Sequence, residues 1–179
     1  MMTNVKRSIV DRMRGAAMLD VATYEEVEAD TSATGQAAIV VVISAIASAI
    51  GAAGPGGPSV VGVLIGSIIS WLIWAGITYI IGDKIFGGTA TWGELLRTLG
   101  FAQAPRVLLV LGIIPVFGLL VWFAVAIWVL VAGIIAIRQA LDFSTQKALL
   151  TALIGWAIVN VAQWLLRDIG DFGAMTPGF

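Results

Sequence analysis

The longest charge-free run in the sequence places the strongest constraint on the fold. Between Arg106 and Arg138, 31 consecutive residues carry no charge. A single α-helix of that length would be roughly 46 Å long, well beyond the roughly 30 Å hydrocarbon core of a bilayer. Pro115 and Gly118 lie where a break would divide the run, because proline and glycine interrupt helices. The run therefore predicts a hairpin of two membrane-spanning helices.

Other apolar runs extend this prediction to the whole chain. The sequence of 179 residues is 59% hydrophobic and only 12% charged, which leaves too little polar surface to cover a soluble globule. Since a span needs roughly 20 apolar residues, the chain has room for four or five. We predict an all-α polytopic membrane protein with a five-span bundle. The predicted spans are about 36–53, 59–82, 101–114, 118–137 and 147–166, between an N-terminal segment 1–35 and a tail 167–179.

The positions of Lys and Arg predict the direction of these spans. With five spans and a cytoplasmic N-terminus, nine of the ten basic residues lie on the cytoplasmic side and only Arg167 lies outside. That distribution follows the positive-inside rule. If 107–137 were one tilted span, the distribution would be eight against two, which the rule also permits. We therefore predict five spans with the C-terminus outside, and a four-span protein is the alternative.

The N-terminal segment predicts two short helices. In the first helix, apolar residues recur at helical spacing among basic ones: Val5, Ile9, Met13 and Ala16. This pattern is typical of an amphipathic helix on anionic phospholipid head groups, and a frayed, solvated tail is the alternative. Thr23 and Glu26 have the spacing of a capping box at the start of the second helix. Its acidic face either docks a partner or is simply solvated.

Two residue types are missing from the chain, and their absence restricts its chemistry. There is no Cys and no His, so the usual thiolate nucleophiles, proton shuttles and haem or metal ligands are unavailable. No Asp or Glu lies inside a clearly predicted span, which weighs against proton-coupled transport. The net charge of −1 gives no electrostatic case for nucleic-acid binding. We expect no enzyme activity, no cofactor and no metal.

Small residues recur every four positions in the first two predicted spans. Ser44 and Ser48 lie in the first span, and Gly62, Gly66 and Ser70 lie in the second. This spacing allows the backbones of two helices to approach closely in lipid. It predicts that these two spans pack on each other, and self-association through the same face is the alternative.

A polar stretch precedes the third predicted span. Thr91 and Glu94 have capping-box spacing, and Arg97 lies three residues further on, where it can pair with Glu94. Pro105 suits the first turn of a helix, but Arg106 then places a positive charge at a helix N-terminus. We predict a cytoplasmic interfacial helix in which Arg106 contacts a lipid phosphate.

The last predicted span has a polar stripe along one side. Trp156, Asn160, Gln163 and Arg167 fall on one side of a helix, so this side is expected to face protein or a wet crevice. Hydrogen bonding between helices is the simplest interpretation. The candidate lipid or partner contacts are Glu94, Arg97, Arg106, Asn160, Gln163 and Arg167.

Two segments of the chain resemble a known family. The segments "GGTATWGELLRTLGFAQAPRVLL" and "AIRQALDFSTQKALLTALIGWAIV", in this order after an acidic segment and a small-residue span, resemble the Yip domain family of Ypt/Rab-interacting membrane proteins. The resemblance covers roughly 22–166 and implies a five-span bundle with a cytoplasmic N-terminus. The chain is similar to the prokaryotic branch, which implies a plasma (inner) membrane location. Its short N-terminal segment gives no basis for the Rab-dependent trafficking role of eukaryotic members.

These observations predict a non-catalytic membrane scaffold or accessory and assembly subunit of a larger complex, for example a bioenergetic or photosynthetic one. Its expected partners are other membrane proteins and anionic phospholipid head groups. The alternative is a small-solute or lipid transporter with a crevice near Arg106, Asn160 and Gln163. An intramembrane enzyme using Glu94 is a third and weaker hypothesis.

Overall fold

The computed structural model describes residues 7–54, 57–114 and 117–166, with side chains as far as residue 158. The described part of the chain is helical and contains no strand. The helices, in chain order, are α1 (Ile9–Ala17), α2 (Val21–Ala29), α3 (Ala33–Gly51), α4 (Val60–Tyr79), the π-helical η1 (Ile80–Ile85), α5 (Trp92–Phe101), the 3₁₀-helical η2 (Ala104–Ile113), α6 (Phe117–Ala140) and α7 (Thr145–Leu166).

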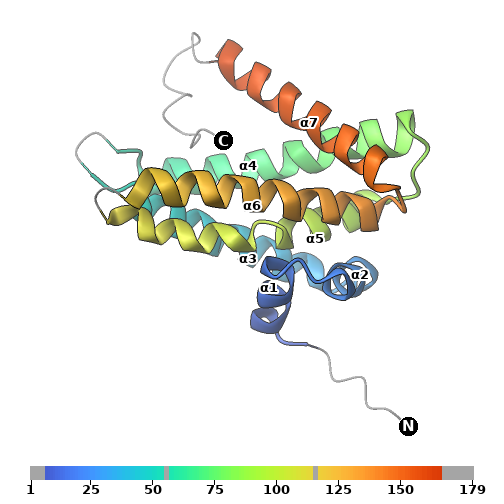
Figure 1. The fold of residues 1–179 in the computed structure, drawn as a ribbon, viewed down its shortest axis with the longest axis horizontal. Helices are drawn as coiled ribbons and strands as arrows, with labels where there is room; N and C mark the ends of the chain where they lie inside the picture. Colours follow the sequence, from blue (N-terminus) through green and yellow to red (C-terminus); the bar gives the residue numbers. More distant parts are fainter. Residues whose placement is uncertain (1–6, 55–56, 115–116, 167–179) are drawn as a thin grey trace.

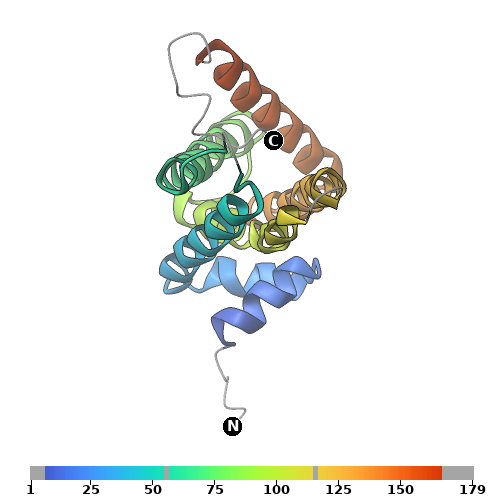
Figure 2. The ribbon, with the colours of Figure 1, turned by 90° about the vertical axis from the view of Figure 1, so that its left-hand side faces the viewer.

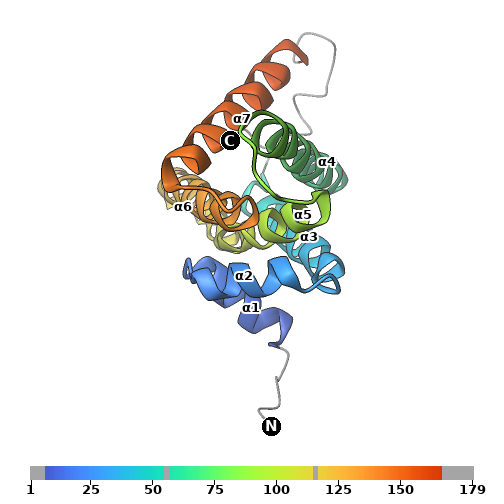
Figure 3. The same cartoon turned by 90° about the vertical axis from the view of Figure 1, so that its right-hand side faces the viewer.

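The long helices form one bundle. α3, α4, α5 and α6 run side by side, and α7 crosses them obliquely (Figure 1). The views along the bundle place α1 and α2 together on one flank, with α4 and α7 on the other (Figures 2 and 3). The N-terminal helices therefore cover the side of the bundle formed by α5, η2 and α6.

Four segments of the described chain are long and apolar enough to cross a membrane. They are Ala33–Gly51, Val60–Ile85, Trp92–Ile113 and Phe117–Ala140. These segments confirm the all-helical membrane fold. α7 is a fifth long helix of 22 residues, roughly 33 Å at the α-helical rise, and its role as a fifth span stays a prediction.

Side-chain caps fix the starts of the short helices. Thr91 and Glu94 form the predicted capping box of α5, with Thr91 N donating to Glu94 Oε2 over 2.7 Å. The box predicted at Thr23 is wrong, because Asp20 caps α2 and Thr23 lies inside that helix. Because α2 begins at Val21, the backbone N–H groups that follow Thr23 already bond within the helix, and the Thr23 side chain has none of them to cap.

The third membrane segment starts at Trp92, ahead of the expected 101–114. It combines ten α-helical residues with ten 3₁₀-helical residues, which rise by about 2.0 Å each, so together they extend roughly 35 Å. Leu95, Leu99 and Phe101 of α5 are fully buried. The polar stretch thus forms a helix that is packed into the bundle, and its position at the cytoplasmic interface stays a prediction.

Close backbone contact joins α3 to η2. A Cβ atom on Gly51 would collide with the carbonyl oxygen of Leu109, and one on Gly112 would lie 3.0 Å from the carbonyl oxygen of Gly51. Only glycine fits on both sides of such a crossing. This contact holds the C-terminal end of η2 against the C-terminal end of α3.

The apolar face of α1 packs against protein. Ala16 is fully buried, and Ile9 and Met13 pack against the bundle core. The expectation that this face lies on lipid is therefore wrong. The reason is the adjacent α2, whose Tyr24 hydroxyl donates to the Ala16 carbonyl over 3.0 Å and closes the helix pair.

Arg12 connects α1, α2 and the start of α3. Its side chain is 1% exposed, and its guanidinium donates to Glu26, Asp30 and Gln36 over 2.8–3.0 Å. Burial opposes its positive charge, but the hydrogen bonds with Asp30 and Glu26 outweigh burial and raise the pKa of Arg12. Arg12, which the sequence placed on a lipid-facing helix, therefore holds α1 to α2 and to the start of α3.

Candidate functional site: a cavity with a buried arginine

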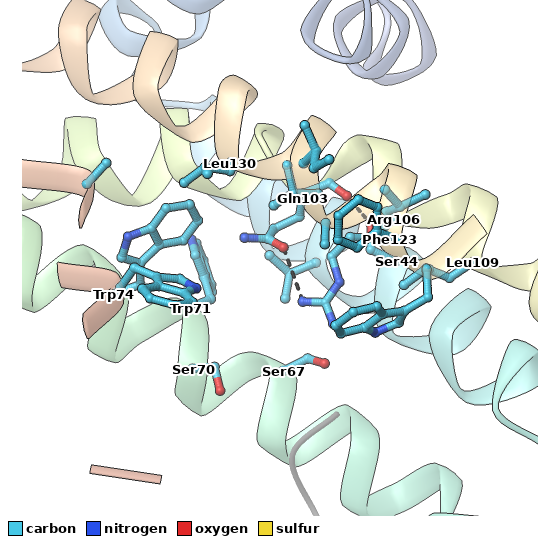
Figure 4. Close-up of a pocket in the computed structure, with 18 residues that line it drawn as sticks. Ser44, Ser67, Ser70, Trp71, Trp74, Gln103, Arg106, Leu109, Phe123 and Leu130 are labelled. Atoms are coloured by element: carbon cyan, nitrogen blue, oxygen red, sulfur yellow. Dashed lines mark hydrogen bonds between the residues drawn. The ribbon is translucent and has the colours of Figure 1, made fainter. Parts of the chain in front are cut away.

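A cavity of about 320 Å³ lies between α3, α4, η2, α6 and α7 (Figure 4). Its walls are mostly apolar, with side chains of Val, Leu, Ile and Phe. Four tryptophans also line it: Trp71, Trp74, Trp122 and Trp156. A volume of this size is at the lower end of the range for small-molecule sites, which are likewise mainly apolar with a few polar groups.

Among the described residues that line this cavity, Arg106 is the charged one. It is 9% exposed, and its Nη1 donates to Gln103 Oε1 over 3.2 Å. Gln103 is also buried, and its backbone carbonyl accepts a 3.0 Å hydrogen bond from Ser44 on α3. The described residues that line the cavity include no Asp or Glu. An ionisable side chain inside a membrane bundle usually marks a functional site, since burying its charge is costly.

The 3₁₀ winding of η2 directs its polar residues to one side. In a 3₁₀-helix residues three apart are eclipsed, whereas in an α-helix they diverge by about 60°. Gln103, Arg106 and Leu109 have this spacing, and all three line the cavity. Pro105 lies in the first turn, where its missing N–H removes no hydrogen bond.

Ser67 on α4 adds an unsatisfied hydroxyl to the cavity lining. The residue is 6% exposed, and its Oγ is one of two buried side-chain polar atoms without a hydrogen-bond partner in the described chain. Figure 4 shows Ser67 and Ser70 on α4 across the cavity from Arg106. A buried hydroxyl without a partner costs roughly 1–3 kcal/mol, so a ligand that accepts from it would recover this cost.

The cavity opens toward the outside of the bundle along α6 and α7. Three of its lining side chains are strongly exposed: Phe123, Ile127 and Trp156. All three are apolar or aromatic, which suits the hydrocarbon interior of a bilayer better than water. A ligand could therefore reach Arg106 sideways from the membrane.

The comparison with family models matches the Yip1 domain over residues 20–166, a range that contains α2 and all four apolar membrane segments. The chain belongs to the Yip1 domain family. The match begins at the cap of α2 and ends at the last residue of α7. Yip1 proteins are non-enzymatic multi-pass membrane proteins that interact with other, generally membrane-associated proteins. No curated protein and no solved structure matches the chain.

Arg97 of this Yip1 domain binds α2 instead of its neighbour on α5. It is 5% exposed and donates to the carbonyl oxygens of Val27, over 2.9 Å, and Glu28. These carbonyls belong to the last turn of α2, where backbone acceptors lack partners within the helix. The predicted pair of Arg97 with Glu94 is not formed, because the Glu94 carboxylate closes the capping box.

The predicted site residues of the Yip1 domain do not meet at one place. Arg106 lies in the cavity, Arg97 binds α2, and Glu94 caps α5. Trp156 lines the cavity, while the side chains of Asn160 and Gln163 on α7, and Arg167, lie outside the described residues. The predicted lipid phosphate contact of Arg106 at the surface does not agree with its burial.

The small residues of the first two membrane helices divide between two contacts. Ser44 binds η2 and Ser48 donates to the carbonyl of Ser44, whereas Ala45, Ala49 and Val63 form the core between α3 and α4. On α4, Gly62 and Gly66 are buried and Ser70 lines the cavity. The predicted packing of α3 on α4 is present, but the serine face of α3 is turned toward η2.

The alternative hypothesis predicted a crevice near Arg106, but not the part of the cavity that α4 and α6 line, and one signal in the sequence could have indicated the wall formed by α4. Trp71 and Trp74 on α4 lie three apart, near Ser67 and Ser70, so this turn of α4 alternates hydroxyl and aromatic groups. In the structure Trp71 Nε1 donates to the Leu96 carbonyl over 3.1 Å, which fixes the indole at the cavity wall. Polar and aromatic residues on one helix face are typical of a face turned toward protein.

Glu28 of the Yip1 domain, on α2 outside the membrane segments, has a strongly raised pKa. Burial in the contact between α2 and the bundle, followed by the nearby charges of Glu94 and Asp142, raises its pKa to about 7, although Arg97 acts in the opposite direction. Glu28 therefore gains its negative charge near neutral pH.

Proposed function

We propose that this protein is a non-catalytic scaffold or accessory subunit of a larger membrane protein complex. The observation that carries the proposal is the attachment of the N-terminal helix pair, α1 and α2, to the membrane bundle. Arg97 donates to the last turn of α2, Trp128 Nε1 donates to the Ala17 carbonyl over 2.7 Å, and Gln139 Nε2 donates to Glu25 Oε1 over 3.0 Å.

These attachments favour a docking role because they fix the helix pair before a partner arrives. A preformed surface loses less conformational entropy on binding than a loose tail. On the outward side of α1, Val10 and Met18 are each 67% exposed. Exposed apolar side chains on a rigid helix pair are suited to contact a partner protein.

The use of the buried polar groups also supports a non-catalytic role. Arg12 and Arg97 hold helices together, and Glu94 caps α5. A catalytic group needs to contact a substrate, whereas these groups are occupied by the protein's own backbone and side chains. The third hypothesis, an enzyme using Glu94, is therefore the least supported.

The proposed setting is a prokaryotic plasma membrane, with the N-terminus cytoplasmic and the C-terminus outside. It is supported by the distribution of Lys and Arg along the chain. The proposed partners are other membrane proteins, for example of a bioenergetic or photosynthetic complex, together with anionic phospholipid head groups.

Native purification tests the scaffold role. The tagged protein would be isolated from its own membrane in a mild detergent, with a photo-crosslinking residue at Val10 or, as the matched control, at Ala22 on the exposed side of α2. We expect a defined complex by mass spectrometry, with crosslinks from position 10 exceeding those from position 22. A monomer that carries no partner and forms no crosslinks from either position would refute the proposal.

The cavity favours a second candidate, a small-solute or lipid transporter. Its polar end, at Arg106, is connected to the outside of the bundle by exposed apolar residues of α6. Flux measured in proteoliposomes tests this candidate. Equal flux through the wild type and an Arg106→Ala variant would exclude transport by this route.

A further inference from the structure

We propose that the cavity binds an uncharged lipid with a carbonyl-bearing ring and one apolar chain, a quinone-type molecule, and that a ring carbonyl accepts a hydrogen bond from Ser67. Binding of this kind requires neither the scaffold role nor transport. It is supported by the unsatisfied hydroxyl of Ser67, by the tryptophans of the cavity walls and by the opening toward the bilayer. No free donor on Arg106 is needed, because its guanidinium already interacts within the protein.

The Ser67 hydroxyl is not bonded in the way that other buried hydroxyls of these helices are. Ser48, Thr98 and Thr151 each donate to the backbone carbonyl four residues earlier, over 2.7–2.9 Å. Ser67 Oγ has no partner in the described part of the chain, and the residue lines the cavity opposite Arg106 (Figure 4). It lies roughly 10 Å from the start of α4, within a membrane segment. A ligand oxygen in the cavity would supply the missing acceptor.

The polar groups of the lining favour a ligand that accepts hydrogen bonds and does not donate them. The Ser44 hydroxyl already donates to the Gln103 carbonyl, and the side-chain oxygen of Gln103 already accepts from Arg106. A quinone has carbonyl acceptors and no N–H or O–H group, so it would satisfy Ser67 without burying a donor of its own. An alcohol or a quinol would bring such a donor. An uncharged ligand also avoids the large cost of moving a charge out of water.

The tryptophans of the cavity favour a planar ring over a plain acyl chain. Trp71 and Trp74 of α4, Trp122 of α6 and Trp156 of α7 line the cavity. Trp71 is 6% exposed, and its hydrogen bond to the Leu96 carbonyl holds the indole in place. Contacts between aromatic rings stabilise beyond the apolar area that they bury. A ring head group would gain this contribution, whereas an acyl chain would not.

The size and the opening of the cavity are suited to a ring that carries one chain. The volume of about 320 Å³ is at the lower end of the range for small-molecule sites, so it would enclose a ring head group but not a diacyl phospholipid. Phe123 and Ile127 of α6 line the cavity and are strongly exposed. The chain would extend past these apolar side chains into the hydrocarbon of the bilayer.

Tryptophan quenching tests the inference on the full-length protein in detergent micelles. Decyl-benzoquinone, whose ring quenches nearby indoles, is titrated at a constant detergent concentration. Four of the seven tryptophans line the cavity, so the bound quinone would quench a large part of the emission. The competitors are decylbenzene, which lacks the carbonyls, and methyl decanoate, which lacks the ring. We expect saturable quenching by the quinone and, from displacement, an apparent Kd for each competitor at least fivefold higher.

Variants identify the site of binding. Ser67→Ala removes the donor and should raise the Kd for the quinone about fivefold without changing that for decylbenzene. Thr78→Val is the matched control, because Thr78 carries an unsatisfied buried hydroxyl on the same helix and is not among the lining residues; it should bind as the wild type does. Neither variant should lower the unfolding temperature, since each removes a buried hydroxyl without a partner. Ala126→Phe fills the cavity and should abolish the saturable quenching.

Three results would overturn the inference. The first is quenching that rises linearly with the quinone content of the micelles and is unchanged in Ala126→Phe. The second is a Ser67→Ala variant that binds the quinone as tightly as Thr78→Val does. The third is a competitor that binds as tightly as the quinone, which would identify a purely apolar site for decylbenzene or an acyl-lipid site for methyl decanoate.

Discussion

Replacement of Glu28 by glutamine should stabilise the protein above neutral pH and have little effect in acid. Glu28 lies on α2, where burial and the nearby charges of Glu94 and Asp142 raise its pKa from 4.5 to about 7. Because the folded pKa is above the unfolded one, the folded state binds more protons between these values. The contribution of Glu28 to stability is therefore fully present below about pH 4.5 and is lost as the pH rises through 7.

The size of the effect follows from the pKa shift. Each pKa unit corresponds to about 1.4 kcal/mol, so the full shift sets an upper limit of roughly 3 kcal/mol. The part caused by Glu94 and Asp142 is screened by salt, which lowers the expectation to about 2 kcal/mol at physiological ionic strength. A glutamine keeps the shape of the side chain and cannot ionise, so it avoids this cost.

The assay is thermal unfolding in detergent micelles at pH 4.5 and pH 8, followed by circular dichroism. Wild type and Glu28→Gln should unfold at similar temperatures at pH 4.5, and the variant should unfold several degrees higher at pH 8. Glu25→Gln is the control, since Glu25 is exposed on the same helix and glutamine can still accept from Gln139. A difference between Glu28→Gln and wild type that is the same at both pH values, or a less stable variant at pH 8, would contradict a raised pKa of Glu28 in the folded protein.

Two further substitutions probe packing. Arg12→Met removes the buried cation that Glu26 of α2 and the C-cap residue Asp30 share, and it should cost about 3–5 kcal/mol, seen as faster amide hydrogen exchange in α1 and α2. Arg14→Met, on the exposed side of α1, should change exchange little. Gly51→Ala should clearly lower the unfolding temperature, because the added methyl group would collide with the Leu109 carbonyl oxygen. Gly35→Ala is the control on the same helix. Its methyl group would meet no other atom, so this variant should be neutral or stabilised by up to about 1 kcal/mol. Equal effects within either pair would contradict the packing described.

The membrane class and the capping box of α5 could be predicted because both depend on neighbours along the chain. Hydropathy over about 20 residues identifies a span, and the spacing of Thr91 and Glu94 lies within one helical turn. The destination of Arg97 could not be predicted in this way. Its acceptors lie 69 and 70 residues earlier in the chain, whereas Glu94 lies only three residues away.

The site was harder to predict because it depends on the winding of one segment. Ten consecutive 3₁₀ residues are unusual, and no periodicity in an apolar run distinguishes them from α-helix. In an α-helix Gln103, Arg106 and Leu109 would spread over about 120° of the helix surface, and the sequence then predicted Arg106 at a lipid-facing surface. The lipid-facing position predicted for α1 was wrong for a similar reason. An amphipathic pattern suits protein and lipid equally well, and only the packing of α1 against the core decides between them.

The hydrogen bond between Trp128 and Ala17 has a consequence for the surrounding bilayer. Trp128 lies halfway along α6, roughly 18 Å from Ala140, so the polar N-terminal helices cover much of that side of the bundle. On the opposite flank α4 presents exposed apolar side chains from Val60 to Ile80. The hydrophobic thickness of the protein is thus unequal on its two sides, and lipids must thin beside α1 and α2 or the bundle must tilt.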